Sequence, residues 1–250
     1  MIKGFLEGLA SYIKAIDTAN KYKLWKYLWV PGIAGVLIAI LIIWLGLRFA
    51  NPFADWLLSM YPWDWGRSIL EWTAPWITAL TFLAIGFMLY KYLVLIVSFP
   101  FMSFISQKIE KEKYGDIHND PNVSPHYQFL KDMIRGAGIS FYLLLGELGW
   151  TLLLLIASLI PGFALFSGIG IFLIQAYYAG AGNMDYTLER YYGIQDSRRW
   201  MSKESGLAMG NGTGFLFILA IPVLGLFVAP VLGTIAMTLP VLERLEKEVI

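Results

Sequence analysis

The stretch "IPVLGLFVAPVLG", Ile221 to Gly233, is wholly apolar and yet contains two prolines and two glycines. Proline removes a backbone hydrogen-bond donor, and glycine is the weakest ordinary helix former. Because these helix breakers recur within a short apolar run, the pattern favours a turn between two short helices. A single kinked helix is the alternative that the pattern leaves open.

The composition indicates a membrane protein. Of the 250 residues, 58% are hydrophobic and 15% are charged, whereas soluble domains are about half apolar and about a quarter charged. The chain has 10 Trp and 14 Tyr, which favour membrane interfaces. Its net charge of +1 argues against a nucleic-acid partner, and its lack of cysteine excludes disulfides and thiolate chemistry. We therefore expect an all-α integral membrane protein forming one membrane domain over residues 1–250.

Two apolar runs, residues 28–50 and 76–100, are long enough to cross a hydrocarbon core about 30 Å thick as helices. We expect the spanning part of the second helix to end at Pro100, and the sequence after it to continue as a helix that leaves the membrane and stops at Gly115. A loop rich in tryptophan and proline is expected between them at 51–75, and a polar helical segment is expected after them at 102–138.

Two further apolar segments, 139–182 and 207–240, carry proline and glycine near their middle and predict helical hairpins. We expect both hairpins to enter the bilayer only partly. The halves of the second are about ten residues long and reach only about 15 Å as helices. Two full crossings are the alternative for the first segment. The residues expected at the turns are Pro161, Gly162, Pro222, Gly225 and Pro230.

The positive charges predict the orientation. Sixteen of the 19 Lys and Arg residues fall in four regions, 1–27, 102–138, 183–206 and the C-terminal tail, and two flank or occupy the 51–75 loop. Basic segments near membrane helices stay in the cytoplasm. We therefore expect a multi-pass protein of the inner (cytoplasmic) membrane with both termini cytoplasmic.

Residues 1–27 begin with an amphipathic helix. This helix lies on the membrane surface or packs against the protein's own loops. Its large apolar side chains share one face at helical spacing: Ile2, Phe5, Leu6, Leu9, Tyr12, Ile13 and Ile16.

Lys91 and Glu147 interrupt apolar runs. Ionisable residues in membrane segments are costly and usually face a cavity, a partner or water. Lys91 is a candidate for a transport pathway, or it snorkels to the interface. Glu147 is a second pathway candidate, a partner for Lys91, or a helix-packing group. The basic pair Arg198 and Arg199 marks topology more often than a ligand site.

Glycines also cluster beside polar residues, in "GAGN" at 180–183 and "GNGTG" at 210–214. Such segments either hold an anion at a helix end or let two helices approach closely.

Three segments together resemble the CysZ family of sulfate permeases, which share a domain with eukaryotic etoposide-induced membrane proteins. They are "FPFMSFISQKIEKEKYG", "MDYTLERYYG" and "IPVLGLFVAPVLGTIAMT". The resemblance implies two long spanning helices, two partly penetrating hairpins, a homo-oligomer and sulfate uptake. The residues that carry it are Pro100, Phe101, Glu110, Asp185, Tyr186, Gly212, Pro222 and Pro230.

In that family a Gly-X-Arg-Arg-like stretch associated with sulfate precedes the first spanning helix. The corresponding segment here is "KLWKYLWVP", in which the arginine positions fall at Trp25 and Lys26. The resemblance therefore makes Lys23 and Lys26 the candidate anion-binding residues. Lysine offers an anion a point charge, whereas arginine offers a bidentate fork.

We therefore predict a channel or permease for sulfate or a related small oxyanion. The expected partners are membrane lipids, further copies of the chain and the anion itself. No cofactor, metal site or enzyme activity is expected, since the sequence has no phosphate-binding glycine loop and no nucleophile elbow. The alternative function is a non-transporting membrane scaffold that binds lipid or partner proteins.

Overall fold

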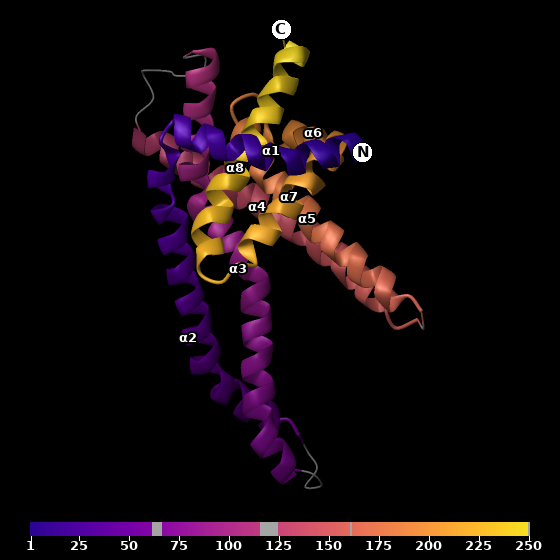
Figure 1. Ribbon diagram of the computed structural model, residues 1–250. Helices are drawn as coiled ribbons and strands as arrows, with labels where there is room; N and C mark the ends of the chain where they lie inside the picture. The colour runs from indigo at the N-terminus through magenta and orange to yellow at the C-terminus, as the bar shows by residue number, and fades with distance from the viewer. Residues whose placement is uncertain (62–66, 116–124, 161, 250) are drawn as a thin grey trace. The chain divides into compact units, whose positions relative to one another are not determined.

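The computed structural model describes residues 1–61, 67–115, 125–160 and 162–249; a few side chains in these ranges, including that of Lys91, lie outside the described part. The structure is 90% helical, with no strand among the described residues. The elements (Figure 1) are α1 (Ile2–Lys21), the 3-10 helix η1 (Leu24–Tyr27), α2 (Trp29–Ser59), α3 (Arg67–Tyr114), α4 (Pro125–Ala157), α5 (Ala164–Leu188), α6 (Ile194–Lys203), α7 (Ser205–Leu219) and α8 (Leu224–Val249).

Among the described residues, four helical segments are long and apolar enough to cross a membrane. They are Leu24–Ser59, Tyr127–Ala157, Ala164–Leu188 and Leu224–Lys247. The expectation of an all-α membrane protein is confirmed.

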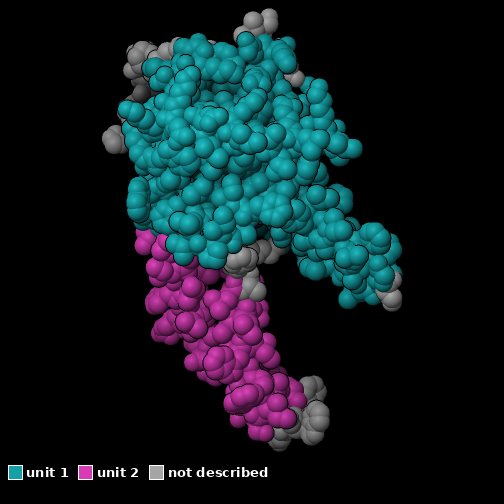
Figure 2. All heavy atoms as spheres, viewed as in Figure 1, with its two compact units in different colours: residues 1–33, 95–250 teal, residues 34–94 magenta. Residues whose placement is uncertain are grey.

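The chain forms two compact units, which Figure 2 colours separately. The smaller unit, residues 34–94, consists of parts of α2 and α3. Its contacts run in opposite directions along the two helices, from Gly35 beside Tyr90 to Phe53 against Phe82. The two helices in this unit are therefore antiparallel.

Both long helices extend further than the sequence predicts. Helix α2 continues through Pro52, and α3 passes through Pro75 and Pro100, so the loop predicted at 51–75 is mostly helical where the structure describes it. Helix α3 is continuous through Pro100 and ends at Tyr114, which agrees with the continued helix expected up to Gly115. Phe99 and Met102, on either side of Pro100, are fully buried in the core of the larger unit. Their packing offsets the backbone hydrogen bond that proline removes.

The larger unit, residues 1–33 and 95–250, is built on helices that approach closely. Helix α7 packs on α1 and α5 (Figure 1). At the α5–α7 crossing, a Cβ atom added to Gly212 would overlap the carbonyl oxygen of Ala176, and one added to Gly180 would overlap that of Ala208. "GAGN" and "GNGTG" therefore let the two backbones touch, which is the packing interpretation of these segments.

Helix α1 packs through its small residues. Its buried face consists of Gly8, Ser11, Ala15 and Ala19, and it contacts α7 and α8. Most of the large apolar side chains predicted on one face stay exposed, and Ile2 and Ile13 are more than 70% exposed. One face of the helix thus packs on the protein, on helices α7 and α8 and not on the loops that the alternative named, and another face presents an apolar surface. A position of this helix on the membrane surface stays a prediction.

Each predicted hairpin segment contains a turn. The first turn lies between α4 and α5, where Gly162 adopts a φ of +88°; Pro161 lies outside the described residues. The second turn lies between α7 and α8 and contains Pro222, whose carbonyl oxygen accepts a hydrogen bond from the Leu224 amide at 2.7 Å.

The positions predicted for Gly225 and Pro230 are wrong in detail. Gly225 is the second residue of α8 and does not lie at the centre of the turn. A Cβ atom at this position would overlap the carbonyl oxygens at the end of α7, which α8 passes closely. Pro230 lies in the second turn of α8 and not in the first, because the chain already reverses at Pro222.

Candidate functional site

The predicted anion-binding lysines lie at the junction of α1 and η1, and both are exposed. Lys23 has a left-handed φ of +53° and follows the end of α1. The Lys26 Nζ atom lies 5.1 Å from the centre of the Tyr27 ring, and the Lys108 Nζ atom of α3 lies 6.0 Å from the same ring. The fold therefore brings Lys26 and Lys108 to one aromatic ring.

The two pathway candidates fall in different units. Glu147 lies on α4 in the larger unit and is 4% exposed. Lys91 lies on α3 in the smaller unit, and its side chain is outside the described part. Their predicted pairing stays a prediction.

The structure also shows a buried charged cluster where the apolar parts of α4 and α5 end. Arg135 of α4 donates to both carboxylate oxygens of Asp185, from Nε at 3.0 Å and from Nη2 at 2.8 Å. It also donates to Ser197 Oγ of α6 and to the Tyr192 carbonyl oxygen. Such a planar two-point pair is the strongest form of charged hydrogen bond. It ties α4, α5 and α6 together.

A second buried pair joins α3 to the residues after α5. Arg190 Nε donates to Glu110 Oε2 at 2.6 Å, and its Nη2 donates to Ser106 Oγ at 2.8 Å. Tyr191 donates its hydroxyl hydrogen to the same glutamate. Removing a charge from water is costly unless a partner and further hydrogen bonds satisfy it, and these groups are so satisfied.

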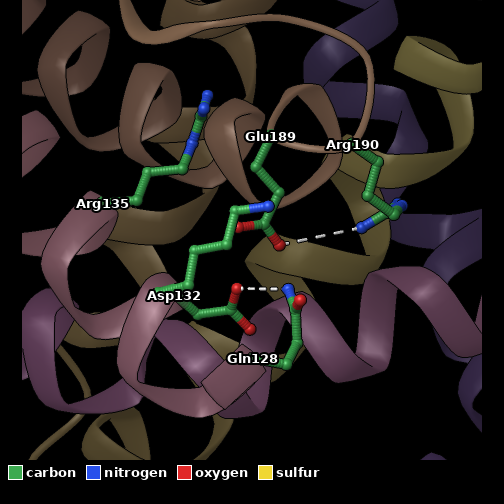
Figure 3. A pocket seen from close by; sticks show the side chains of 6 residues that line it. Gln128, Asp132, Arg135, Glu189 and Arg190 are labelled. Atoms are coloured by element: carbon green, nitrogen blue, oxygen red, sulfur yellow. Dashed lines mark hydrogen bonds and ion pairs between the residues drawn. The ribbon is translucent and has the colours of Figure 1, made fainter. Parts of the chain in front are cut away.

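A cavity of about 180 Å³ lies beside the two arginines, and Figure 3 shows its lining. Gln128 donates to Asp132 Oδ1 at 2.7 Å, and Arg190 lies 4.0 Å from Glu189. Arg135 points away from Asp132 in this view, since its partner is Asp185. The residues that line the cavity are Gln128, Lys131, Asp132, Arg135, Glu189 and Arg190.

Burial raises the pKa of the Glu189 carboxyl well above its ordinary value, and the nearby charge of Asp132 adds to the effect. Ser103 donates a hydrogen bond to this carboxyl. Burial therefore favours the neutral form of Glu189 more than in an exposed carboxyl, and the charge of Arg190 acts in the opposite direction. Because Arg135 and Arg190 are already bound to carboxylates, the cluster mainly fixes the positions of α3, α4, α5 and α6.

Neutral polar groups continue from this cluster into the helices. Ser106 hydrogen-bonds to Thr187 at 2.8 Å, one helical turn from Asn183 on the same face of α5. Asn183 donates to Asn211 of α7 at 2.8 Å, and Asn211 donates to the Gly233 carbonyl oxygen of α8 at 3.0 Å. All four side chains are buried, and each has a partner.

Sequence reasoning did not single out Arg135 or Arg190, and it pointed to Asn183 and Asn211 only as members of "GAGN" and "GNGTG". A usable signal was present, because polar residues interrupt small apolar residues in "GAGNMD" and "GNGTG". The ion pairs themselves leave no such signal, since Arg135 and Asp185 are 50 positions apart.

Comparison with known proteins assigns the family. The chain matches the profile of the family described as sulfate transporter CysZ/etoposide-induced protein 2.4 over residues 11–230. No curated protein matches it. The matched range includes most of α1, all of α2 to α7 and the start of α8, and therefore both turns and the charged cluster. The chain belongs to the sulfate transporter CysZ/etoposide-induced protein 2.4 family.

Proposed function

We propose that this protein is a channel or permease that carries sulfate or a related small oxyanion across the membrane. The observation that carries the proposal is the match to a sulfate transporter family over residues 11–230 of a chain with four potential spans. Membership of the family supports a role related to transport. The identity of the anion and the channel or permease mechanism go beyond what the family shows.

The buried polar groups support this function. From Asn211 through Asn183, Thr187 and Ser106, uncharged donors lead to Arg190 inside an otherwise apolar unit. Groups that conduct an ion must bind it well enough to admit it and weakly enough to release it. An ion would have to displace the present partners of these donors, so its binding there would be weak and reversible.

Sulfate uptake into liposomes tests the proposal. The purified protein is reconstituted alone, and radiolabelled sulfate is measured inside the vesicles over time, without ATP or another protein. We expect uptake above that of protein-free vesicles and of vesicles with an unrelated multi-pass protein. Uptake equal to both controls would overturn transport and favour the scaffold function.

We further propose that both termini lie in the cytoplasm at the inner membrane and that the two hairpins penetrate the bilayer only partly. The charge distribution supports this orientation, and the two turns support the hairpins. Single cysteines can be placed at Val223, Gly162 and Ser59 of the cysteine-free chain. An impermeant maleimide outside the cell should label only the one at Ser59. Equal labelling of all three would contradict the proposal.

We also propose that several copies of the chain assemble with lipid around them. Large apolar side chains are exposed along the middle of α4, among them Phe141, Leu145 and Leu152. Lipid or other copies must cover such a surface. Native mass spectrometry of the purified protein should show a defined oligomer, and a monomer at all concentrations would refute assembly.

A further inference from the structure

A second pocket, of about 340 Å³, lies between α4 and α6. Four of its lining residues share one face of α6 at helical spacing, and Tyr142 comes from α4. No acidic side chain is among the described residues that line it. Its lining consists of Tyr142, Gln195, Arg198, Arg199 and Ser202.

Arg198 is fixed in this pocket by stacking. Its guanidinium carbon lies 3.4 Å from the centre of the Tyr142 ring. Its Nε atom is buried and has no hydrogen-bond partner in the described part of the chain. A buried charged donor without a partner is rare and costly, and an oxygen atom of a ligand would satisfy it.

Arg198 differs in this respect from Arg135 and Arg190. Arg135 is bound to Asp185, and Arg190 is bound to Glu110. The neighbour Arg199 pairs with Asp196 at 3.1 Å, but its side chain is 80% exposed and such surface pairs are weak. The pocket thus holds Arg198, whose Nε atom has no partner among the described residues, and the weakly paired Arg199.

We propose that this pocket binds a tetrahedral oxyanion of the sulfate and phosphate class. A guanidinium group can donate parallel N–H groups to two oxygens of such an ion, and Arg198 brings one to this pocket. Arg199 adds charge, and the side chains of Gln195, Ser202 and Tyr142 add neutral donors. The site rests on these five residues and does not depend on whether the protein transports sulfate.

The ion has two possible sources, a free inorganic anion or the phosphate of an anionic lipid headgroup. Phe141 and Leu145, on the same helix as Tyr142, are large, apolar and exposed. Helix α6 is polar and carries the two arginines. The pocket therefore lies where an apolar helix surface meets a basic one, which both sources can reach.

The test uses the purified, delipidated full-length protein in neutral detergent. Sulfate and phosphate are titrated calorimetrically at constant ionic strength with chloride as the competing salt. In a parallel measurement, native mass spectrometry counts retained phosphatidylglycerol against phosphatidylcholine. Arg198→Gln removes the stacked fork, and Arg48→Gln removes an exposed arginine of α2 as the matched control.

Saturable binding of the free ion that weakens at least about tenfold in Arg198→Gln, and not in Arg48→Gln, would establish the free anion as the ligand. Selective phosphatidylglycerol retention lost in the same variant would establish the headgroup. Equal binding of both ligands by a folded Arg198→Gln variant and by wild type would overturn the site. Should Arg198→Gln not fold, the exposed Arg199→Gln variant decides, with a several-fold loss expected and wild-type binding as the contrary result.

Discussion

The two helical hairpins have similar sequence patterns and opposite surroundings. In α8, 72% of the most apolar stretch is buried inside the protein, against 33% in α5 and 22% in α4. The contacts of α7 include glycines that leave no room for a larger side chain, such as Gly210 and Gly212. By contrast, large apolar side chains such as Leu159 and Leu165 surround the exposed α4–α5 turn. Hydropathy alone does not distinguish the helices that are buried in the protein from those that are exposed. Side-chain size does, because small residues let helices meet and large ones cover a lipid-facing surface.

The charged base of the α4–α5 hairpin should be its most sensitive point. Asp185→Asn leaves the Arg135 guanidinium without its carboxylate in a buried position. We expect a loss of about 3–5 kcal/mol in unfolding free energy, measured by denaturant titration in detergent. Glu71→Gln, in the exposed pair with Arg67, is the control and should cost less than about 1 kcal/mol. Equal losses in both variants would show that the buried pair contributes nothing specific.

The contact between the two hairpins, where α7 crosses α5, should not tolerate an added methyl group. Gly212→Ala places a methyl group against the Ala176 carbonyl oxygen, and we expect a loss of about 1–3 kcal/mol from overpacking. Gly168→Ala near the exposed turn meets open space and should be neutral or slightly stabilising. Thermal unfolding of the two variants in parallel measures the difference. A neutral Gly212→Ala would remove size as the distinction between the hairpins.

The buried Glu189 should make the base of the first hairpin sensitive to pH. Because its pKa is raised on folding, the folded state holds its proton more tightly than the unfolded state, and stability falls as the pH rises above the unfolded value near 4.5. Glu189→Gln keeps the side chain neutral. We expect it to be more stable than wild type by on the order of 1 kcal/mol at pH 8, with the difference shrinking at pH 5.

Unfolding of wild type and Glu189→Gln is followed at both pH values. A variant that is less stable than wild type at pH 8 would show that the ionised carboxylate is needed in the fold.

The smallest effect on folding is expected at the predicted lysines. Lys23→Gln with Lys26→Gln alters two exposed side chains and should change unfolding free energy by less than about 0.5 kcal/mol. If these lysines bind the transported anion, sulfate affinity should nevertheless fall, as calorimetry would detect. Lys3→Gln with Lys14→Gln on α1 provides a control of equal charge. Unchanged affinity in the folded double variant would exclude Lys23 and Lys26 as the site.

The apolar runs and the two turn regions could be predicted from the sequence because hydropathy and helix breakers act locally. The end of α3 was also predictable from Gly115, whereas the burial of Phe99 and Met102 that keeps the helix unbroken at Pro100 was not. The partners of Arg135 and Arg190 could not be predicted either. Each ion pair joins residues at least 50 positions apart, and no local pattern encodes that distance.

The buried face of α1, which consists of small residues, bears on the order in which the helices assemble. Its neighbours are α7 and α8, and Glu7 receives two hydrogen bonds from Arg244, 237 positions later. During synthesis the first helix therefore emerges long before the surface it fits. We expect its exposed apolar face to lie on the bilayer surface until α7 and α8 are made. Docking of α1 would then follow the synthesis of α8.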